Sequence, residues 1–208
     1  MPPKQPTHTR QAELVAAALA LAAVRSPAEV TTAALAQAVG ITQGAVFRHF
    51  ESKEAIWLAV IDFAHQDLLA RLHAAAAAQV QPLAALRAVF MAHVDFVVEQ
   101  PGVPRVIFQE LQHPEDTPLK ARVRGLMQAY RTLLTGLLQR AQAARLLAPG
   151  TDLQAAAVLF IGSVQGLVMQ SLLSGQVGAM RAQAPAVCQL LQQAVAATGH
   201  TPSHQETP

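Results

Sequence analysis

The sequence has few of the residues that cross-link a chain or build a β-sheet. Its 208 residues include one cysteine, Cys188, which excludes an internal disulfide and is typical of a reducing cytoplasm. We interpret Cys188 as a small buried residue. Aromatic residues make up 4% and charged residues 13% of the chain, whereas 52% are hydrophobic. This composition favours closely packed helices over sheet.

Motifs for common enzyme chemistry are also missing. Ser163 follows Gly162 but lies outside a Gly-x-Ser-x-Gly elbow, and no glycine-rich phosphate-binding loop occurs. His93 and His113 lack the His-x-x-x-His spacing, with a third ligand in register, that a zinc site needs. We therefore expect no catalytic residue, no metal and no cofactor.

No uninterrupted apolar run is long enough to cross a membrane. The run from Ala155 to Gly162, like the longer one from Leu14 to Val24, is shorter than the roughly 18 residues of a spanning helix. The N-terminal region alternates with a helical period, unlike the apolar core of a signal peptide. We expect a cytoplasmic protein without membrane partners.

Positive charge is concentrated at the N-terminal end of the chain. The formal net charge is +2, and the excess lies within residues 1–53, which contain Lys4, Arg10, Arg25, Arg48 and Lys53. A bias of this size permits nucleic-acid contact without requiring it.

The segment from Thr31 to Lys53 predicts two short helices joined by a tight turn. Thr31 or Thr32 can cap the first helix, and Gly40 suits the left-handed conformation that ends it. Thr42 is placed to cap the second helix. Such a corner forms a helix-turn-helix, whose second helix lies in the major groove of DNA, although similar corners also occur in ordinary all-α cores.

Side chains around this corner have the chemistry of DNA contacts. The Gln43 amide suits adenine, Gly44 allows close backbone approach, and Ala45 can meet a thymine methyl. Capping residues and hydrogen-bond donors beside them suit phosphates. The residues that we predict to contact DNA are Thr31, Thr32, Thr42, Gln43, Gly44, Ala45, Phe47, Arg48, His49 and Lys53, with Arg48 suited to a base or a phosphate.

A longer pattern runs through and beyond the corner. It comprises Thr31-Thr32, Leu35-Ala36, Val39-Gly40-Ile41-Thr42, Gly44-Ala45-Val46-Phe47, His49-Phe50 and Ser52-Lys53-Glu54. This pattern resembles that of the tetracycline-repressor (TetR) family of bacterial transcription regulators. Phe47 stands where the family usually has tyrosine, so we expect it to keep a packing role and to lose one phosphate contact. The resemblance implies a ligand-responsive repressor of transcription.

Helical periodicity and capping signals continue along the rest of the chain. We predict an all-α fold of about nine helices, with a three-helix DNA-binding domain at residues 1–52 and a ligand-binding and dimerisation domain at 53–198. Residues 1–8 are predicted as a mobile arm and 199–208 as a disordered tail. The run Thr151-Asp152-Leu153-Gln154 predicts a capping box at the start of the eighth helix.

The second domain carries large apolar residues and isolated polar groups, which a small-molecule cavity requires, although core packing explains each residue singly. The predicted effector pocket comprises Phe90, Met91, His93, Phe96, Phe108, Met127, Tyr130, Phe160, Gln165 and Met169. The effector is expected to be small and mostly apolar. The basic residues Lys120, Arg122 and Arg124 suit either an anionic ligand or a solvated helix face.

A single small corner cannot provide useful sequence specificity, so we expect a homodimer that presents two corners to a palindromic operator. Gly162 and Gly166 lie four residues apart and would let helices of two subunits approach closely, although they suit packing within one subunit equally. The expected partners are a double-stranded DNA operator, a small-molecule effector and a second copy of the chain. The alternative hypothesis is a helical small-molecule-binding protein or enzyme that does not bind DNA.

Overall fold

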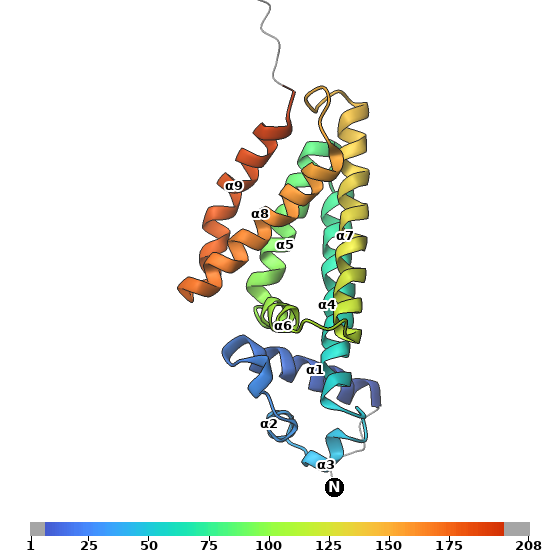
Figure 1. The fold of residues 1–208 in the computed structure, drawn as a ribbon, viewed down its shortest axis with the longest axis vertical. Helices are drawn as coiled ribbons and strands as arrows, with labels where there is room; N and C mark the ends of the chain where they lie inside the picture. Colours follow the sequence, from blue (N-terminus) through green and yellow to red (C-terminus); the bar gives the residue numbers. More distant parts are fainter. Residues whose placement is uncertain (1–6, 198–208) are drawn as a thin grey trace, which may run out of the picture.

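The computed structural model describes residues 7–197, and the regular elements of this part of the chain are all helices, without a β-strand. Three helices form one end of the molecule, which we call the head (Figure 1): α1 (Thr7–Val24), α2 (Thr32–Ala38) and α3 (Gln43–Val46). A short 3-10 helix, η1 (Pro27–Glu29), joins α1 to α2. The described residues contain nine α-helices, which confirms the predicted fold class.

The other six helices form an elongated body. They are α4 (Lys53–Ala77), α5 (Pro82–Glu99), α6 (Gly102–Leu111), α7 (Pro118–Ala143), α8 (Leu153–Ser174) and α9 (Met180–Val195), with the 3-10 helix η2 (Val177–Ala179) before α9. The long helices α4 and α7 run side by side, α8 crosses α5 and contacts α7, and α9 packs against α8 and α5 (Figure 1). The short helix α6 lies between the head and the body and contacts α1, α4 and α7.

Side-chain caps fix the start of several helices, and for α2 and α3 they lie where the sequence predicts them. In each case the side-chain oxygen accepts a hydrogen bond from the backbone N–H three residues later; the capping residues are Thr31, Thr42, Ser52 and Thr117. Gly40 ends α2 with a φ of +67°, and the N–H of Ile41 donates to the carbonyl oxygen of Ala36 at 2.9 Å. This arrangement turns the chain sharply from α2 into α3.

Two predictions about helix ends are wrong. The helix α1 begins at Thr7, so residues 7 and 8 belong to it and not to the predicted arm; residues 1–6 and the predicted tail at 199–208 lie outside the described residues. Asp152, not Thr151, caps α8, because its Oδ1 accepts hydrogen bonds from the N–H groups of Gln154 (2.8 Å) and Ala155 (3.1 Å). A carboxylate is also favoured electrostatically at the positive end of a helix.

Helix α8 is more apolar than its uninterrupted runs suggest. Over its most apolar window the mean hydropathy is 1.7, and by length and composition alone the helix could cross a membrane. The length of the uninterrupted runs does not show this, because glycine, serine and glutamine divide the apolar runs without adding charge. In the folded chain α8 packs against α5, α7 and α9 and buries Phe160, Val164 and Val168, as a core helix does.

One continuous core joins the head to the body. Helix α4 contributes to both, since it packs against α1 near its start and against α5 and α7 along its length. Its buried residues extend from Ile56 and Trp57 beside the head to Leu72 and Ala76 in the body. Helices α4 and α6 are therefore the elements that connect the head to the body.

Candidate nucleic-acid interface and ligand cavity

The first turn of α3 lies at the outer surface of the head (Figure 1). Gln43 and Gly44 are exposed, whereas Val46 is fully buried and holds the helix against the rest of the head. A Cβ atom at Gly44 would meet no heavy atom within 4 Å, so the backbone there is open to close approach. The residues predicted to read bases therefore sit together on an accessible helix end.

The Gln43 side chain is positioned by α2. Its Nε2 donates a hydrogen bond to the Thr32 hydroxyl oxygen at 2.8 Å, which links the two helices of the corner. The second amide hydrogen and the amide oxygen are not used in this bond. The hydrogen bond to Thr32 therefore fixes the orientation of the Gln43 amide, and the amide can still form hydrogen bonds with a base.

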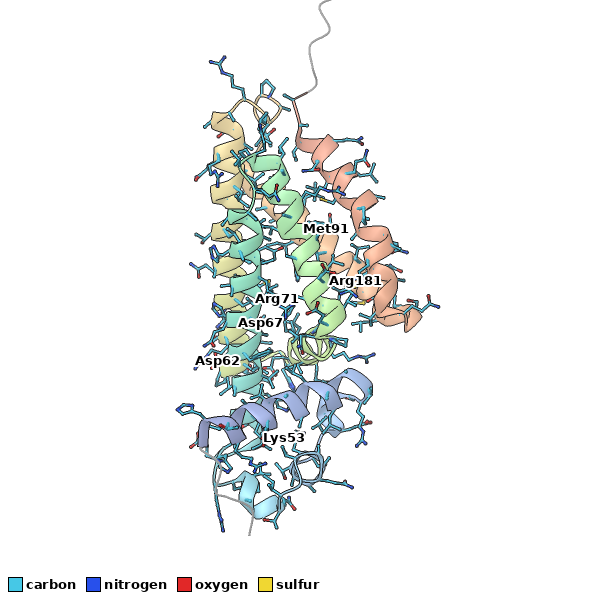
Figure 2. The ribbon with its side chains drawn as sticks, turned by 180° about the vertical axis from the view of Figure 1, so that it is seen from behind. Lys53, Asp62, Asp67, Arg71, Met91 and Arg181 are labelled. Atoms are coloured by element: carbon cyan, nitrogen blue, oxygen red, sulfur yellow. The ribbon has the colours of Figure 1, made fainter. Side chains whose placement is uncertain are left out.

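Donors predicted to hold phosphates flank this helix. Lys53, at the start of α4, donates from Nζ to the carbonyl oxygen of Ala28 at 3.0 Å, which places the ammonium beside η1 (Figure 2). Arg48 is exposed, and no hydrogen bond joins its guanidinium to another described residue. Phe47 is 50% exposed, so part of its ring is accessible for a packing contact with a sugar or a base.

His49 is only half accessible. Its carbonyl oxygen accepts a hydrogen bond from Gln11 Nε2 at 2.9 Å, which ties the end of the corner to α1. Its ring Nδ1 is buried without a partner among the described residues. A phosphate contact from this ring would have to come from Nε2.

A cavity of about 620 Å³ opens among α5, α6, α7 and α8. This volume lies within the roughly 300–1,000 Å³ of pockets that hold small molecules. The structure brings five of the predicted pocket residues to its wall: His93, Phe96, Phe108, Met127 and Gln165.

The other five predicted pocket residues do not line the cavity. Phe90, Tyr130 and Phe160 form a buried aromatic cluster with edge-on rings, whose centroids lie 5.3 Å (Phe90 to Phe160) and 6.4 Å (Tyr130 to Phe160) apart. Met91 lies on the side of α5 towards α9 (Figure 2), and Met169 is 43% exposed. The prediction failed here because residue type does not say which side of a buried helix faces a cavity.

Sequence reasoning missed many of the residues that complete the wall. The apolar ones are Leu68, Val97, Val103, Pro104, Ile107, Leu111, Val123, Leu126, Ile161 and Val168. They were missed because a search for aromatic and methionine side chains passes over smaller residues. The remaining polar residues of the wall all come from α7: Lys120, Arg124, Gln128 and Arg131. The sequence singles out Lys120 and Arg124 for an anionic ligand, whereas it leaves out Gln128 and Arg131, although their spacing along the helix is a signal that could have been found.

His93 supplies a neutral polar point in the wall. Its Nδ1 lies 3.1 Å from the Tyr130 hydroxyl oxygen, and the two rings meet edge to face at 5.2 Å. Burial lowers the pKa of His93 to about 4 and raises the pKa of Tyr130 above its usual range. Both side chains are therefore uncharged near neutral pH. The other ring nitrogen, Nε2, has no partner among the described residues and remains for a ligand.

Helix α8 presents small and apolar residues to the surface. Gly162 and Gly166 are both exposed, and a Cβ atom at either would meet nothing within 4 Å. Large apolar side chains stand exposed beside them: Val158 (62%), Leu159 (48%) and Leu173 (75%). We call Val158, Leu159, Gly162, Gly166, Met169 and Leu173 the α8 face. An apolar surface of this kind is typical of an interaction site.

Comparison with known families matches both parts of the chain. A family described as "Bacterial regulatory proteins, tetR family" matches residues 14–60, which include the corner and the start of α4. A second, described as "Tetracyclin repressor-like, C-terminal domain", matches residues 82–187, about half of the chain. The chain belongs to the TetR family. Members of this family are regulatory proteins of bacteria, and the head of this TetR-family protein is its DNA-binding part.

Curated relatives and solved structures agree with this assignment. The chain is 26% identical over 141 residues to the nucleoid occlusion factor SlmA of Marinomonas sp. (strain MWYL1), covering 68% of this chain and 72% of that protein. The fold resembles a TetR transcriptional regulator from Chloroflexus aurantiacus, with a TM-score of 0.77, 23% identity and coverage of 92% and 98%. It also resembles the transcriptional regulator FadR from Bacillus subtilis in complex with stearoyl-CoA, with a TM-score of 0.76, 18% identity and coverage of 86% and 96%.

Proposed function

We propose that this TetR-family regulator is a cytoplasmic repressor that binds a palindromic operator as a homodimer and releases it when a small, mostly apolar effector enters the cavity. The observation that carries the proposal is the accessible start of α3, where Gln43, Gly44 and Ala45 stand among residues suited to phosphates. Residues 1–52 would then form the DNA-binding domain and 53–198 the effector and dimer domain. No membrane partner is part of this proposal.

The cavity supports the effector half of the proposal. Its wall is mainly apolar, and His93 and Gln165 add two separated polar groups that can orient a ligand. The related fold of FadR holds stearoyl-CoA, which supports a ligand with an acyl chain.

Binding is proposed here without a catalytic step. Among the described residues the cavity wall contains no carboxylate, hydroxyl or thiol. His93 in this wall is hydrogen-bonded to Tyr130. Among the described residues, no group of three His, Cys, Asp or Glu side chains could hold a metal ion. These observations favour a sensor over the alternative of an enzyme.

The route from cavity to head passes through α6. Val103, Pro104 and Ile107 of this helix line the cavity, while the same helix packs against α1 of the head. An effector that binds more tightly to one position of α6 shifts the head towards the position that goes with it, whereas DNA binds more tightly to a different position of the head. The coupling is reciprocal, because each ligand disfavours the conformation that the other selects.

The α8 face supports the dimer. Its exposed apolar side chains lie around Gly162 and Gly166, where a second helix can approach closely. Two copies joined there would place two heads at a fixed separation, which is what a palindrome requires.

Recovery of the DNA that the protein binds across a bacterial genome tests this function. The proposal expects a small set of duplex sites with two-fold symmetry, bound with an affinity that falls steeply as salt is raised. Weak binding without preferred sites, or affinity that does not depend on salt, would contradict it. A variant with Gln43, Arg48 and Lys53 all changed to alanine serves as the control for binding through the head.

A further inference from the structure

The mouth of the cavity carries positive charge along one face of α7. Lys120, Arg124, Gln128 and Arg131 follow one another at intervals of four, four and three residues, which places them on one face of the helix. All four line the cavity. The described wall therefore contains three cationic side chains and no anionic one.

Internal partners occupy two of these cations. Arg124 pairs with Asp116 through bonds of 2.6 and 3.1 Å, and this pairing lowers the pKa of Asp116. Lys120 Nζ donates to the carbonyl oxygens of His113 and, at 2.8 Å, of Glu115. The third basic residue of the predicted set, Arg122, points elsewhere and pairs with Asp62 at 2.6 Å.

Arg131 differs from its neighbours. It is exposed at the mouth, and no hydrogen bond or ion pair joins its guanidinium to any described residue. A guanidinium can hold a carboxylate or a phosphate with two parallel hydrogen bonds. Of the three cations in the wall, Arg131 is the one that a ligand can bind without breaking a bond within the protein.

The interior behind this mouth has the opposite character. Phe96, Ile107 and Met127 belong to a continuous apolar wall, in which burial of a hydrocarbon tail is favourable. A purely apolar ligand would bury its tail but would gain nothing from the charged mouth. A ligand with an acid group at one end satisfies both parts of the cavity.

We propose that the effector is an amphipath with an anionic head group, held at the mouth by Arg131, with its apolar tail inside the cavity towards Phe96 and Met127. This inference rests on the proposed effector role of the cavity and narrows the ligand class. The head group is a carboxylate or a phosphate, because both match the guanidinium in charge and geometry.

Calorimetric titration of the full chain with four probes of equal chain length tests the class. The probes are decanoate, decyl phosphate, 1-decanol and decylamine, which share a tail and differ in the head group. The two anions should bind about tenfold or more tightly than the alcohol, the effect of one charge-assisted hydrogen bond, and the amine should bind most weakly. Whichever of decanoate and decyl phosphate binds more tightly shows whether the head group is a carboxylate or a phosphate.

Two variants of α7 localise the effect. Arg131→Gln should reduce the affinity for the anions to that for 1-decanol and should leave the affinity for 1-decanol unchanged. Arg140→Gln is the matched control, because Arg140 is exposed on the same helix and lies outside the cavity wall. Lys120→Gln should produce a smaller loss than Arg131→Gln.

Several results would overturn the inference: equal binding of decanoate and 1-decanol, equal effects of Arg131→Gln and Arg140→Gln, or binding of none of the probes. A failure of the effector site itself has a different signature. Met127→Trp fills the apolar part of the cavity, so tail binding that survives this change lies outside the cavity and contradicts the proposed function. If Met127→Trp abolishes binding of 1-decanol but the head group makes no difference, only the anionic class is wrong.

Discussion

Gly102, at the start of α6, packs so closely against α1 that a Cβ atom there would overlap the carbonyl oxygen of Leu19. The obstacle is backbone, which cannot rotate away as a flexible side chain can. Because α6 also lines the cavity, this contact is the point where a movement caused by a ligand would reach the head.

Replacement of Gly102 by alanine should push α6 away from α1. We expect the free energy of unfolding to fall by about 1–3 kcal/mol, the usual cost of overpacking, and DNA affinity to fall with it. Urea denaturation measures the first effect. Gly125→Ala is the control, since Gly125 lies within α7 with open space around it and should gain up to about 1 kcal/mol from helix propensity. Equal stabilities of the two variants would show that the contact with Leu19 is not tight.

The two kinds of DNA contact should respond differently to mutation. Lys53→Ala should weaken binding to every duplex and lower the salt slope by about one, because it removes a phosphate contact. Gln43→Ala should cost roughly 1–3 kcal/mol on the operator and relax the preference at one base pair. Fluorescence anisotropy with operator and random duplexes at several salt concentrations separates the two. The same loss on both duplexes for both variants would contradict this division.

A leucine at Gly166 should prevent dimerisation without unfolding the subunit. The space around Gly166 is open in the single chain, so the added side chain has room until a second helix approaches. Light scattering should show monomers for Gly166→Leu and dimers for the parent. Gly125→Leu, which adds the same side chain to exposed α7, should remain dimeric. A Gly166→Leu dimer of unchanged affinity would place the interface elsewhere.

The buried His93 should make stability depend on pH in the acid range. Burial lowers its pKa from 6.5 to about 4, so between these values the unfolded chain binds a proton that the folded chain does not. The free energy of unfolding should therefore fall by up to about 3 kcal/mol as the pH is lowered from 6.5 to 4. His93→Gln keeps a polar partner for Tyr130 but cannot titrate, and it should lack this component. If urea denaturation gives the same dependence of the free energy of unfolding on pH for the parent and for His93→Gln, the pH dependence does not come from His93.

The sequence predicted the head more completely than the cavity, for a physical reason. Caps such as Thr31 and Thr42 act on backbone groups within one turn, so their effect can be read from neighbouring residues. The cavity depends on contacts between helices far apart in sequence. Tyr130 is the type of residue that often lines a pocket, yet it lies in the aromatic cluster. The smaller Val97 and Pro104 line the cavity instead.

Short-range competition explains the remaining differences. Thr151 and Asp152 both offer an oxygen at the start of α8, and the carboxylate forms the cap while the Thr151 hydroxyl donates to the carbonyl oxygen of Ala148 at 2.7 Å. Phe47 follows α3 directly as its C-cap, and its ring is half exposed, which the spacing of the residues does not indicate. Such outcomes depend on three-dimensional orientation, which residue spacing alone does not determine.

Operator affinity measured against the concentration of a cavity-binding compound tests most directly whether the cavity controls the head. A suitable compound is one that raises the Tm of the protein, since a ligand that prefers the folded state stabilises it. The account predicts that such compounds lower the affinity for operator DNA, and that Met127→Trp abolishes both effects while it still binds the operator. Stabilising compounds that leave operator affinity unchanged, or a Met127→Trp variant that responds like the parent, would contradict it.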